Sequence, residues 1–204
     1  MSNYLSIAVI TAAIHEIVQA AVEDAVAGVT VRVGPPRAAT PGEREVNLYL
    51  YHLTPNAQLR NDDLPMRSGE GVLEKRPRVA IDLHYLIAFS GEDRLESEMM
   101  LGKVCTMLHA VPVLVPEHLR RMVRPGGSFP YLGHSNLAAQ RERVKLTPEY
   151  LSLEELTKLW TVFFQIAHRP SLQYVASPVL LDADMAPRAR RAHFVEPPPE
   201  EEWA

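Results

Sequence analysis

Apolar positions in the first 27 residues follow a helical period. They recur every three or four residues, at Ile10, Ile14, Ile17, Ala21 and Ala25. This spacing places them on one face of a helix. Residues 2–27 contain neither proline nor glycine, and Gly28 follows at the kind of position where helices commonly end. The pattern predicts one long amphipathic helix.

Two later segments have the composition of buried strands. Residues 46–53 (VNLYLYHL) and 79–89 (VAIDLHYLIAF) are rich in β-branched and aromatic side chains. Both faces of the first segment are apolar, with Val46, Leu48 and Leu50 on one and Tyr49, Tyr51 and Leu53 on the other. A sheet that is apolar on both faces needs a covering layer on each side. Helices of the same chain can cover one face, and we expect further helices or a neighbouring subunit to cover the second.

The remaining elements are shorter. Strands are expected at residues 30–33, 143–147 and 172–181, and helices at 92–110, 117–123 and 151–165. Ser152 and Glu155 have the spacing of a capping box at the start of the last helix. On the helix at 92–110 the expected apolar side is Leu95, Met99, Leu101, Val104 and Leu108, and on the helix at 151–165 it is Leu156, Leu159, Trp160 and Phe163. The elements together predict a domain of the α/β (α+β) class.

Two segments stand apart from this pattern. Residues 54–77 form a long polar stretch with three prolines and two glycines, which is typical of a loop that contacts a partner or remains flexible. From residue 183 the chain carries an arginine cluster, three consecutive prolines and three consecutive glutamates. Such a segment buries too little apolar surface to offset the entropy of ordering it. We therefore expect one compact domain over residues 1–182 and a flexible, charged, proline-rich tail over 183–204.

Composition narrows the classes of partner. The 204 residues carry a net charge of -4, which argues against binding nucleic acid through an overall basic field. Cys105 is the single cysteine and cannot form an internal disulfide, so we expect assembly in the cytoplasm. No basic residue precedes Arg32, as a secretory signal would require, and the apolar start is too short and interrupted to span a bilayer. We expect a soluble protein with no nucleic-acid or membrane partner.

Candidate chemistry is sparse. His52, Asp82 and His84 lie on the two strongest strands and are residue types that bind zinc, so a small metal-dependent enzyme is one interpretation. They have no recognised ligand spacing, and histidines on strands usually make ordinary hydrogen bonds. Cys105 and His109 share a helix face, but their neighbours are apolar and indicate a position in the core. We expect no catalytic residue, cofactor or small-molecule substrate.

Four segments resemble a known family. They are residues 46–65 (VNLYLYHLTPNAQLRNDDLP), 76–93 (RPRVAIDLHYLIAFSGED), 101–114 (LGKVCTMLHAVPVL) and 143–181. In their order and spacing they resemble the cap, or tail-terminator, proteins of extracellular contractile injection systems of the antifeeding-prophage type. These are phage-tail-like particles without a head. The resemblance covers nearly the whole chain before the tail.

The resemblance implies a fold and a function. The fold is a compact domain with a mixed, mainly antiparallel sheet of about four to five strands flanked by helices. The function is structural rather than enzymatic: a cap that ends polymerisation of the inner tube and anchors the last sheath layer. The implied partners are further copies of the chain in a homohexameric ring, the inner-tube protein and the sheath protein. The assembled particle then acts in the cytoplasm or is released.

Contact residues are inferred from loop length and composition. The loop at residues 54–77, with Arg60, Asn61, Asp62 and Asp63, is a candidate tube contact. The tail, with Arg188, Arg190 and Arg191, is a candidate arm that reaches the sheath. A phage tail-completion protein, which ends a tube in the same way but attaches to a head, remains a further alternative.

Overall fold

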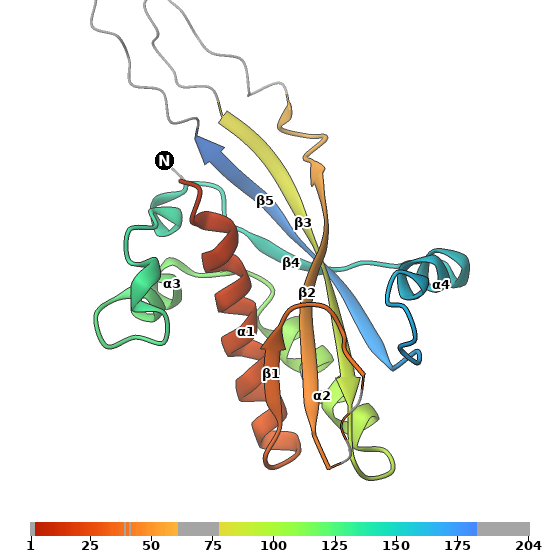
Figure 1. Ribbon diagram of the computed structural model, residues 1–204. Helices are drawn as coiled ribbons and strands as arrows, with labels where there is room; N and C mark the ends of the chain where they lie inside the picture. The colour runs from red at the N-terminus through yellow and green to blue at the C-terminus, as the bar shows by residue number, and fades with distance from the viewer. Residues whose placement is uncertain (1–2, 39, 41, 61–77, 183–204) are drawn as a thin grey trace, which may run out of the picture.

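The structure is a computed structural model, and it describes residues 3–38, 40, 42–60 and 78–182 (Figure 1). Most of the loop expected at 54–77 and the tail expected at 183–204 lie outside the described residues. The elements in chain order are α1 (Ser6–Ala25), β1 (Thr30–Val33), β2 (Glu45–Pro55), β3 (Arg78–Ser90), α2 (Glu96–Ala110), α3 (Pro116–Val123), two 3₁₀ turns, β4 (Lys145–Pro148), α4 (Leu153–Thr161) and β5 (Ser171–Asp182).

The strands form one five-stranded sheet in the order β1-β2-β3-β5-β4. β1 pairs with β2 in parallel, and the other three pairings are antiparallel. The sheet is therefore mixed and mainly antiparallel. Helices lie on both of its sides (Figure 1). The expected fold class is confirmed.

The larger core lies between the sheet and the helices α1, α2 and α3. It joins Val9, Ile10 and Ile14 of α1 to Leu48 and Phe89 of the sheet. By length and composition α1 is apolar enough to cross a membrane, which the sequence analysis did not expect of this segment. Yet 56% of its apolar stretch is buried inside the fold. The structure thus uses α1 as a core helix, and its apolar stripe packs against the sheet.

The other face of the sheet carries a second, smaller core. Trp160 and Phe163, in and just after α4, pack on Leu86 and Ala88 of β3, with Tyr49 beside them. The expected second apolar face is thus present, and α4 covers part of it. The capping box predicted for α4 is confirmed, because the Ser152 side chain accepts a hydrogen bond from the Glu155 N–H and the Glu155 carboxylate accepts one from the Ser152 N–H.

A β-bulge in β2 corrects one part of the strand prediction. The pairing steps from Leu50 opposite Tyr85 to His52 opposite His84, so Tyr51 is an extra residue. Beyond the bulge the alternation is inverted, and Leu53 lies opposite Leu83, whose side chain belongs to the larger core. Leu53 therefore does not share a face with Tyr49 and Tyr51, as the alternation predicted.

Helix α2 begins at Glu96, four residues later than expected, and buries a different stripe. Leu95 and Met99 were expected to be buried but are 68% and 54% exposed. The buried residues are Glu96, Met100, Val104 and Leu108. The Glu96 carboxylate accepts hydrogen bonds from the backbone N–H groups of Glu92 and Asp93 and from the Arg44 guanidinium. These bonds hold Glu96 against the protein, so the inward stripe runs from Glu96 in steps of four.

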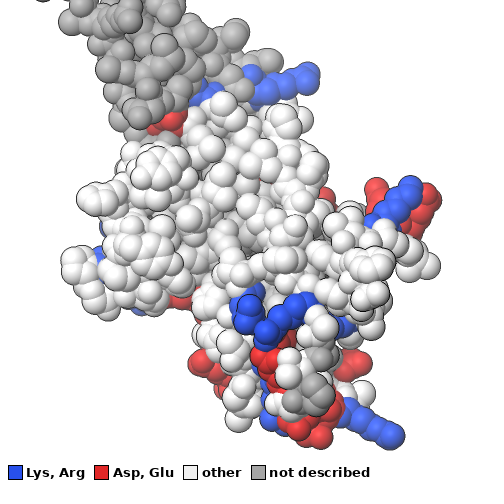
Figure 2. Space-filling view, in the orientation of Figure 1, with Lys and Arg blue, Asp and Glu red and all other residues white. Residues whose placement is uncertain are grey.

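Charged side chains gather at the end of the molecule where β2 begins (Figure 2). Arg37 pairs with Glu43 and Glu45, and Arg44 pairs with Glu96 at 2.9 Å. These pairs fix the β1–β2 connection against the start of α2. In the same view the middle of the molecule is almost free of charged side chains.

Candidate functional site

The three candidate metal ligands lie on one face of the sheet. The bulge at Tyr51 places His52 directly opposite His84, with ring centroids 5.5 Å apart. Asp82 precedes His84 by two residues and lies opposite Thr54. The sequence analysis therefore identified a real cluster of polar side chains on this face.

The polar side-chain atoms of His84 and Asp82 are paired with other residues. His84 Nδ1 lies 2.9 Å from Glu149 Oε1, and its Nε2 lies 2.9 Å from Thr54 Oγ1. The Asp82 carboxylate accepts a hydrogen bond of 2.8 Å from the Asn56 amide. Within residues 3–60 and 78–182, as far as the structure describes them, no three His, Cys, Asp or Glu residues are placed to hold a metal ion. The metal-enzyme interpretation thus has no geometric support there.

Glu149 gives this cluster a structural role. Its carboxylate contacts His84 and also accepts a hydrogen bond of 2.9 Å from the Tyr51 hydroxyl. Burial, and next the hydrogen bond to Glu149, raise the pKa of Tyr51 far above its usual value, so the phenol stays neutral. Because Glu149 lies between β4 and α4, these contacts tie the start of α4 to β2 and β3.

Cys105 and His109 do not form the buried pair that their apolar neighbours indicated. Both residues are exposed on α2. The buried stripe passes through Val104 and Leu108, one position before each of them. The placement of Cys105 in the core was therefore wrong, because the whole stripe of α2 is shifted.

The candidate contact residues are largely outside the described part of the chain. Arg60 is exposed in the turn that follows β2. Asn61, Asp62, Asp63, Arg188, Arg190 and Arg191 lie outside the described residues. Their roles stay predictions.

The outer strands of the sheet are partly closed by the chain's own groups. On β1, the Gln19 side chain accepts from the Val31 N–H at 2.9 Å, and His15 Nε2 bonds the Val31 carbonyl at 3.1 Å. On the opposite side, where β5 extends beyond its pairing with β4, the Gln140 amide bonds the Pro178 carbonyl and the Leu180 N–H. Exposed strand edges invite pairing with other chains, so these contacts remove that option where they occur. The helices offer further candidate contact surfaces.

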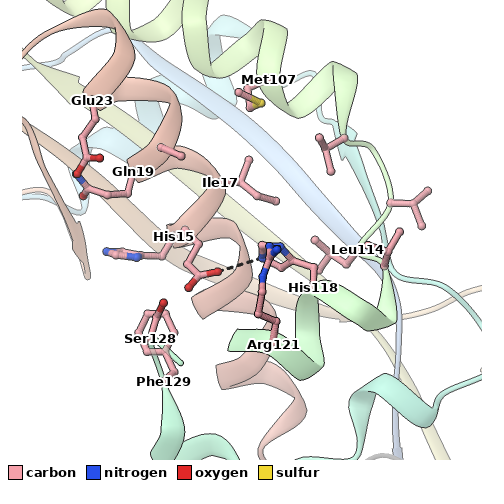
Figure 3. Close-up of a pocket in the computed structure, with 15 residues that line it drawn as sticks. His15, Ile17, Gln19, Glu23, Met107, Leu114, His118, Arg121, Ser128 and Phe129 are labelled. Carbon is pink, nitrogen blue, oxygen red and sulfur yellow. Dashed lines mark hydrogen bonds and ion pairs between the residues drawn. The ribbon is translucent and has the colours of Figure 1, made fainter. Parts of the chain in front are cut away.

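A groove of about 580 Å³ opens between α1, α3 and the end of α2 (Figure 3). Its apolar lining includes Ile17, Ala20, Met107, Val111, Leu114 and Val115. Pro112 and Pro116 separate α2 from α3, and the bridge between Val113 and Lys145 pins the intervening segment to β4. The groove exists because this segment, α1 and α3 are held apart on the same side of the sheet.

Charged side chains border the groove. Figure 3 shows the ion pair between Glu16 and His118, with 3.1 Å between Oε2 and Nε2. Arg121 donates a hydrogen bond to His118 Nδ1 at 3.1 Å. Together these contacts join α1 to α3 across one side of the groove.

A second candidate surface, called here the α4 patch, consists of Leu153, Thr157, Thr161 and Phe164. The four residues line a hollow of about 510 Å³. Leu153, Thr157 and Thr161 are four residues apart and lie on one side of α4, and Phe164 follows the end of the helix. Leu153 and Phe164 are 80% and 82% exposed, and no member of the patch is charged. Both threonine hydroxyls donate to carbonyls of α4 itself.

Comparison with known families decides the family of the chain. Residues 9–193 match the model of the Pvc16 N-terminal domain. The chain belongs to the Pvc16 N-terminal domain family. This confirms the resemblance that the four sequence segments indicated. No curated protein matches the chain.

Two solved structures share the fold of this Pvc16-family chain. One is the sheath/tube terminator of the extracellular contractile injection system PVC in its extended state, with 17% identity and a TM-score of 0.52 over 85% of the chain. The other is the tube-terminating cap of the anti-feeding prophage, with 16% identity and a TM-score of 0.52 over 86% of the chain. The chain spans 56% of the length of each.

Sequence reasoning missed the groove and the α4 patch. The groove is made by segments that lie about 100 residues apart, and no local pattern reports it. The patch did leave a signal in the apolar run Val162, Phe163 and Phe164, because a helix with one buried stripe does not need three such residues in succession. Only Phe163 turns inward, where its ring contacts Tyr49.

Proposed function

We propose that this chain is a structural cap of a contractile injection particle, which ends the inner tube and joins it to the last sheath layer. The carrying observation is membership of the Pvc16 N-terminal domain family over residues 9–193. The shared fold with the PVC terminator and the anti-feeding prophage cap supports it. The chain spans 56% of the length of those two proteins, so the proposal concerns the part of them that it matches.

The surfaces of the described residues suit assembly. The groove and the α4 patch offer apolar surface to partners. The polar cluster around His84 and Glu149 uses its atoms to hold α4 on the sheet. We therefore propose a protein that binds other proteins and catalyses no reaction.

The two segments proposed to contact the particle leave from one end of the sheet. Residue 56 follows the end of β2, and β3 begins at Arg78, so the loop between them leaves and re-enters at the same end. Arg78 is the cross-strand partner of Asp182, the last residue of β5. We propose that the loop contacts the tube and the segment after Asp182 contacts the sheath. Their common origin fits a cap that holds both layers together.

Lateral association of identical copies completes the proposal. A closed ring gives every copy the same contacts, which is the usual solution for homo-oligomers. Six copies of 22.9 kDa give a ring of about 137 kDa. The ring would end a tube by offering a surface to which no further tube layer can bind.

Labelling of tube ends tests the function. The chain, tagged with a gold label, is incubated with preformed tubes of the cognate tube protein and imaged by negative stain. The cap proposal expects gold at one tip of each tube. Gold along the shaft, or no gold on tubes, would refute it. A label found between a tube and a phage head in native particles would support the tail-completion alternative instead.

A further inference from the structure

We infer that a basic surface of this domain binds an acidic segment of the same chain, residues 196–202 (EPPPEEE). The basic surface consists of five exposed cations in or next to α3 and β4, namely Arg120, Arg124, Arg141, Arg143 and Lys145. The inference rests on the proposed function in one respect, because residues 183–204 are proposed there to contact the sheath. It adds a site on the domain that holds this segment until the sheath protein displaces it.

Charge is distributed unevenly along the chain. Residues 116–148 contain six lysines and arginines and only two glutamates, so they carry a net charge of +4, whereas the whole chain carries -4. Residues 196–202 contain four glutamates and no lysine or arginine. The two segments therefore have equal and opposite net charge, which favours contact between them.

The two parts of the basic surface meet at one turn. The Arg120 guanidinium donates to the Ala138 carbonyl at 3.4 Å, and the Arg143 guanidinium donates to the Gln140 carbonyl at 3.0 Å. These carbonyls are two residues apart, so the two guanidinium groups lie on the same turn. Arg143 and Lys145 are exposed and the residue between them is buried, so their side chains point to the same side.

The five cations form no ion pair among the residues that the structure describes. Lys103 and Lys158 show the contrast, because each of them pairs with a carboxylate. Glu117 and Glu142 are the two acidic residues of the 116–148 segment, and neither forms an ion pair with the basic surface in the described part of the chain. Cations gathered on one surface repel one another, and an acidic partner relieves that repulsion.

The chain leaves the sheet beside the basic surface. The Gln140 side chain donates to the Pro178 carbonyl at 3.2 Å and accepts from the Leu180 N–H at 3.3 Å, close to the end of β5 at Asp182. Gln140 is the residue before Arg141. In Figure 1 the end of β5 accordingly lies beside the segment that leads into β4. Residues 183–195 then connect Asp182 to the acidic segment, and a linker of that length spans about 20 Å on average.

A tether makes individually weak ion pairs sufficient. Exposed pairs hold free molecules together poorly, because solvent screens them. A partner on a short linker of the same chain reaches an effective concentration on the order of 1 mM, so the same pairs are formed for more of the time. Pro197, Pro198 and Pro199 restrict the backbone of the acidic segment, which lowers the conformational entropy that binding removes.

Docking of the acidic segment leaves an arginine cluster available to the sheath. Arg188, Arg190 and Arg191 lie between Asp182 and the acidic segment. Because they have the same charge as the basic surface, they are not attracted to it. A sheath protein that binds the whole segment has to compete with the basic surface, so the affinity of an unassembled copy for the sheath is reduced.

Zero-length cross-linking of the full chain tests the contact. A carbodiimide joins a lysine amine to a carboxylate that touches it, and Lys145 is the lysine of the basic surface. The inference expects Lys145 to couple to a glutamate of residues 196–202 at about 0.05 M salt, with a yield that falls about tenfold at about 1 M salt, where the screening length is about 3 Å. Coupling of Lys103 to Asp24 is the reference for reagent activity at both salt concentrations. Mass spectrometry identifies the linked peptides. A Lys145 link found only in dimers of twice 22.9 kDa would overturn the inference, because the occupant would be a second copy.

Charge reversal gives a second readout. Arg124→Glu and Arg141→Glu are combined in one chain, because both positions are exposed and neither side chain makes a hydrogen bond within the described residues. The yield of the Lys145 link should fall at least about fivefold, since two attractive charges become repulsive. Arg94→Glu combined with Lys158→Glu is the matched control, with the same change in net charge at exposed positions outside the surface, and should keep the wild-type yield. Equal losses in the two double variants would overturn the inference.

Nucleic acid is the other anionic occupant that the experiment has to exclude. A fluorescent DNA duplex is titrated with the wild-type chain and with the Arg124→Glu, Arg141→Glu variant at about 0.15 M salt. The inference expects no binding to either. Binding to the wild type that the double variant loses would assign the surface to nucleic acid and would overturn the inference.

Two results separate this inference from the proposed function. If Lys145 never couples to the acidic segment while the chain labels tube tips, the docking is wrong and the cap function stands. If the link forms in a chain that labels no tube tip, the function is wrong and the docking stands. The cognate sheath protein, added in excess, should lower the yield of the link. An unchanged yield on chains that have bound the sheath protein would show that the basic surface does not hold the segment back, and would also overturn the inference.

Discussion

Arg78 and Asp182 are cross-strand partners at one end of the sheet, and Arg78 Nε donates to Asp182 Oδ1 at 3.0 Å. Arg78 is the first residue of β3, and Asp182 is the last residue of β5. The ion pair therefore closes the sheet at the point where the proposed tube and sheath contacts leave it. A fixed end gives both segments a defined starting position.

Arg78→Gln should weaken this end of the sheet. The side chains of Arg78 and Asp182 are 26% and 10% exposed, so the pair is less screened than a surface pair. We expect a loss of about 1 kcal/mol in the free energy of unfolding, at the upper end for partly exposed pairs. Urea denaturation measures it. Lys158→Gln, which breaks the exposed pair with Glu154, should cost about 0.3 kcal/mol. Equal losses in the two variants would show that the Arg78–Asp182 pair is no stronger than an exposed ion pair.

Two glycines should respond to alanine in opposite directions. A Cβ at Gly127 would lie 2.3 Å from the Met122 carbonyl oxygen and 2.5 Å from that of Arg121, both backbone atoms that cannot move freely. Gly127→Ala should therefore cost about 1–3 kcal/mol, as overpacking does. Gly102, in α2, has open space at its Cβ position, and Gly102→Ala should stabilise the protein by about 0.5–1 kcal/mol. If the unfolding temperatures of both variants shift in the same direction, the predicted backbone clash at Gly127 is wrong.

Stability at acid pH should depend on Glu96. The backbone N–H of Asp93, followed by the Arg44 side chain, holds the pKa of the Glu96 carboxyl below its ordinary value of 4.5. A lowered pKa in the folded protein means that the charged form stabilises the fold. This contribution is complete above about pH 4.5 and is lost as the pH falls through the lowered pKa.

Glu96→Gln isolates this effect. The variant should be less stable than the wild type at pH 7, and the difference should shrink towards pH 3, because protonation of the wild-type carboxyl removes its charge. Urea denaturation at both pH values measures the difference. Glu98→Gln, an exposed position on the same helical turn, is the control. A Glu96→Gln deficit of the same size at pH 7 and pH 3 would show that the charge is not the cause.

Deletion of residues 184–204 should separate the two proposed contacts. The ring and the labelling of tube tips should persist, because the loop proposed to contact the tube and the folded domain lie before residue 183. Attachment of the last sheath layer should weaken, which particle images show as sheaths that slip from the capped end. Particles with normal sheaths would exclude the segment as the sheath contact.

The accuracy of the sequence analysis depended on how local each interaction is. The capping box of Ser152 and Glu155 was predicted, because both partners lie within one turn. The inward position of Glu96 was missed, because its partner Arg44 is 52 residues away. The bulge at Tyr51 was missed for the same reason: only the pairing of β2 with β3 reveals it.

The locality of the interactions also explains which parts of the candidate sites the sequence predicted. His52 and His84 were placed together from strand composition, but Glu149, which contacts His84, comes from a segment 65 residues later. The contact with Glu149 occupies His84 Nδ1 and gives His84 a structural role. The groove needs three helices to be assembled before it exists. Sequence patterns therefore predicted the elements, and tertiary contacts determined what the polar and apolar surfaces can do.

The most direct measurement of the central claim is the length of tubes grown with and without this chain. The cognate tube protein is polymerised in the presence of increasing amounts of the chain, and tube lengths are measured in electron micrographs. A cap should shorten tubes in proportion to its concentration and should be found at their ends. Tubes that reach the same length at every concentration of the wild-type chain would contradict the proposal that this protein ends a tube.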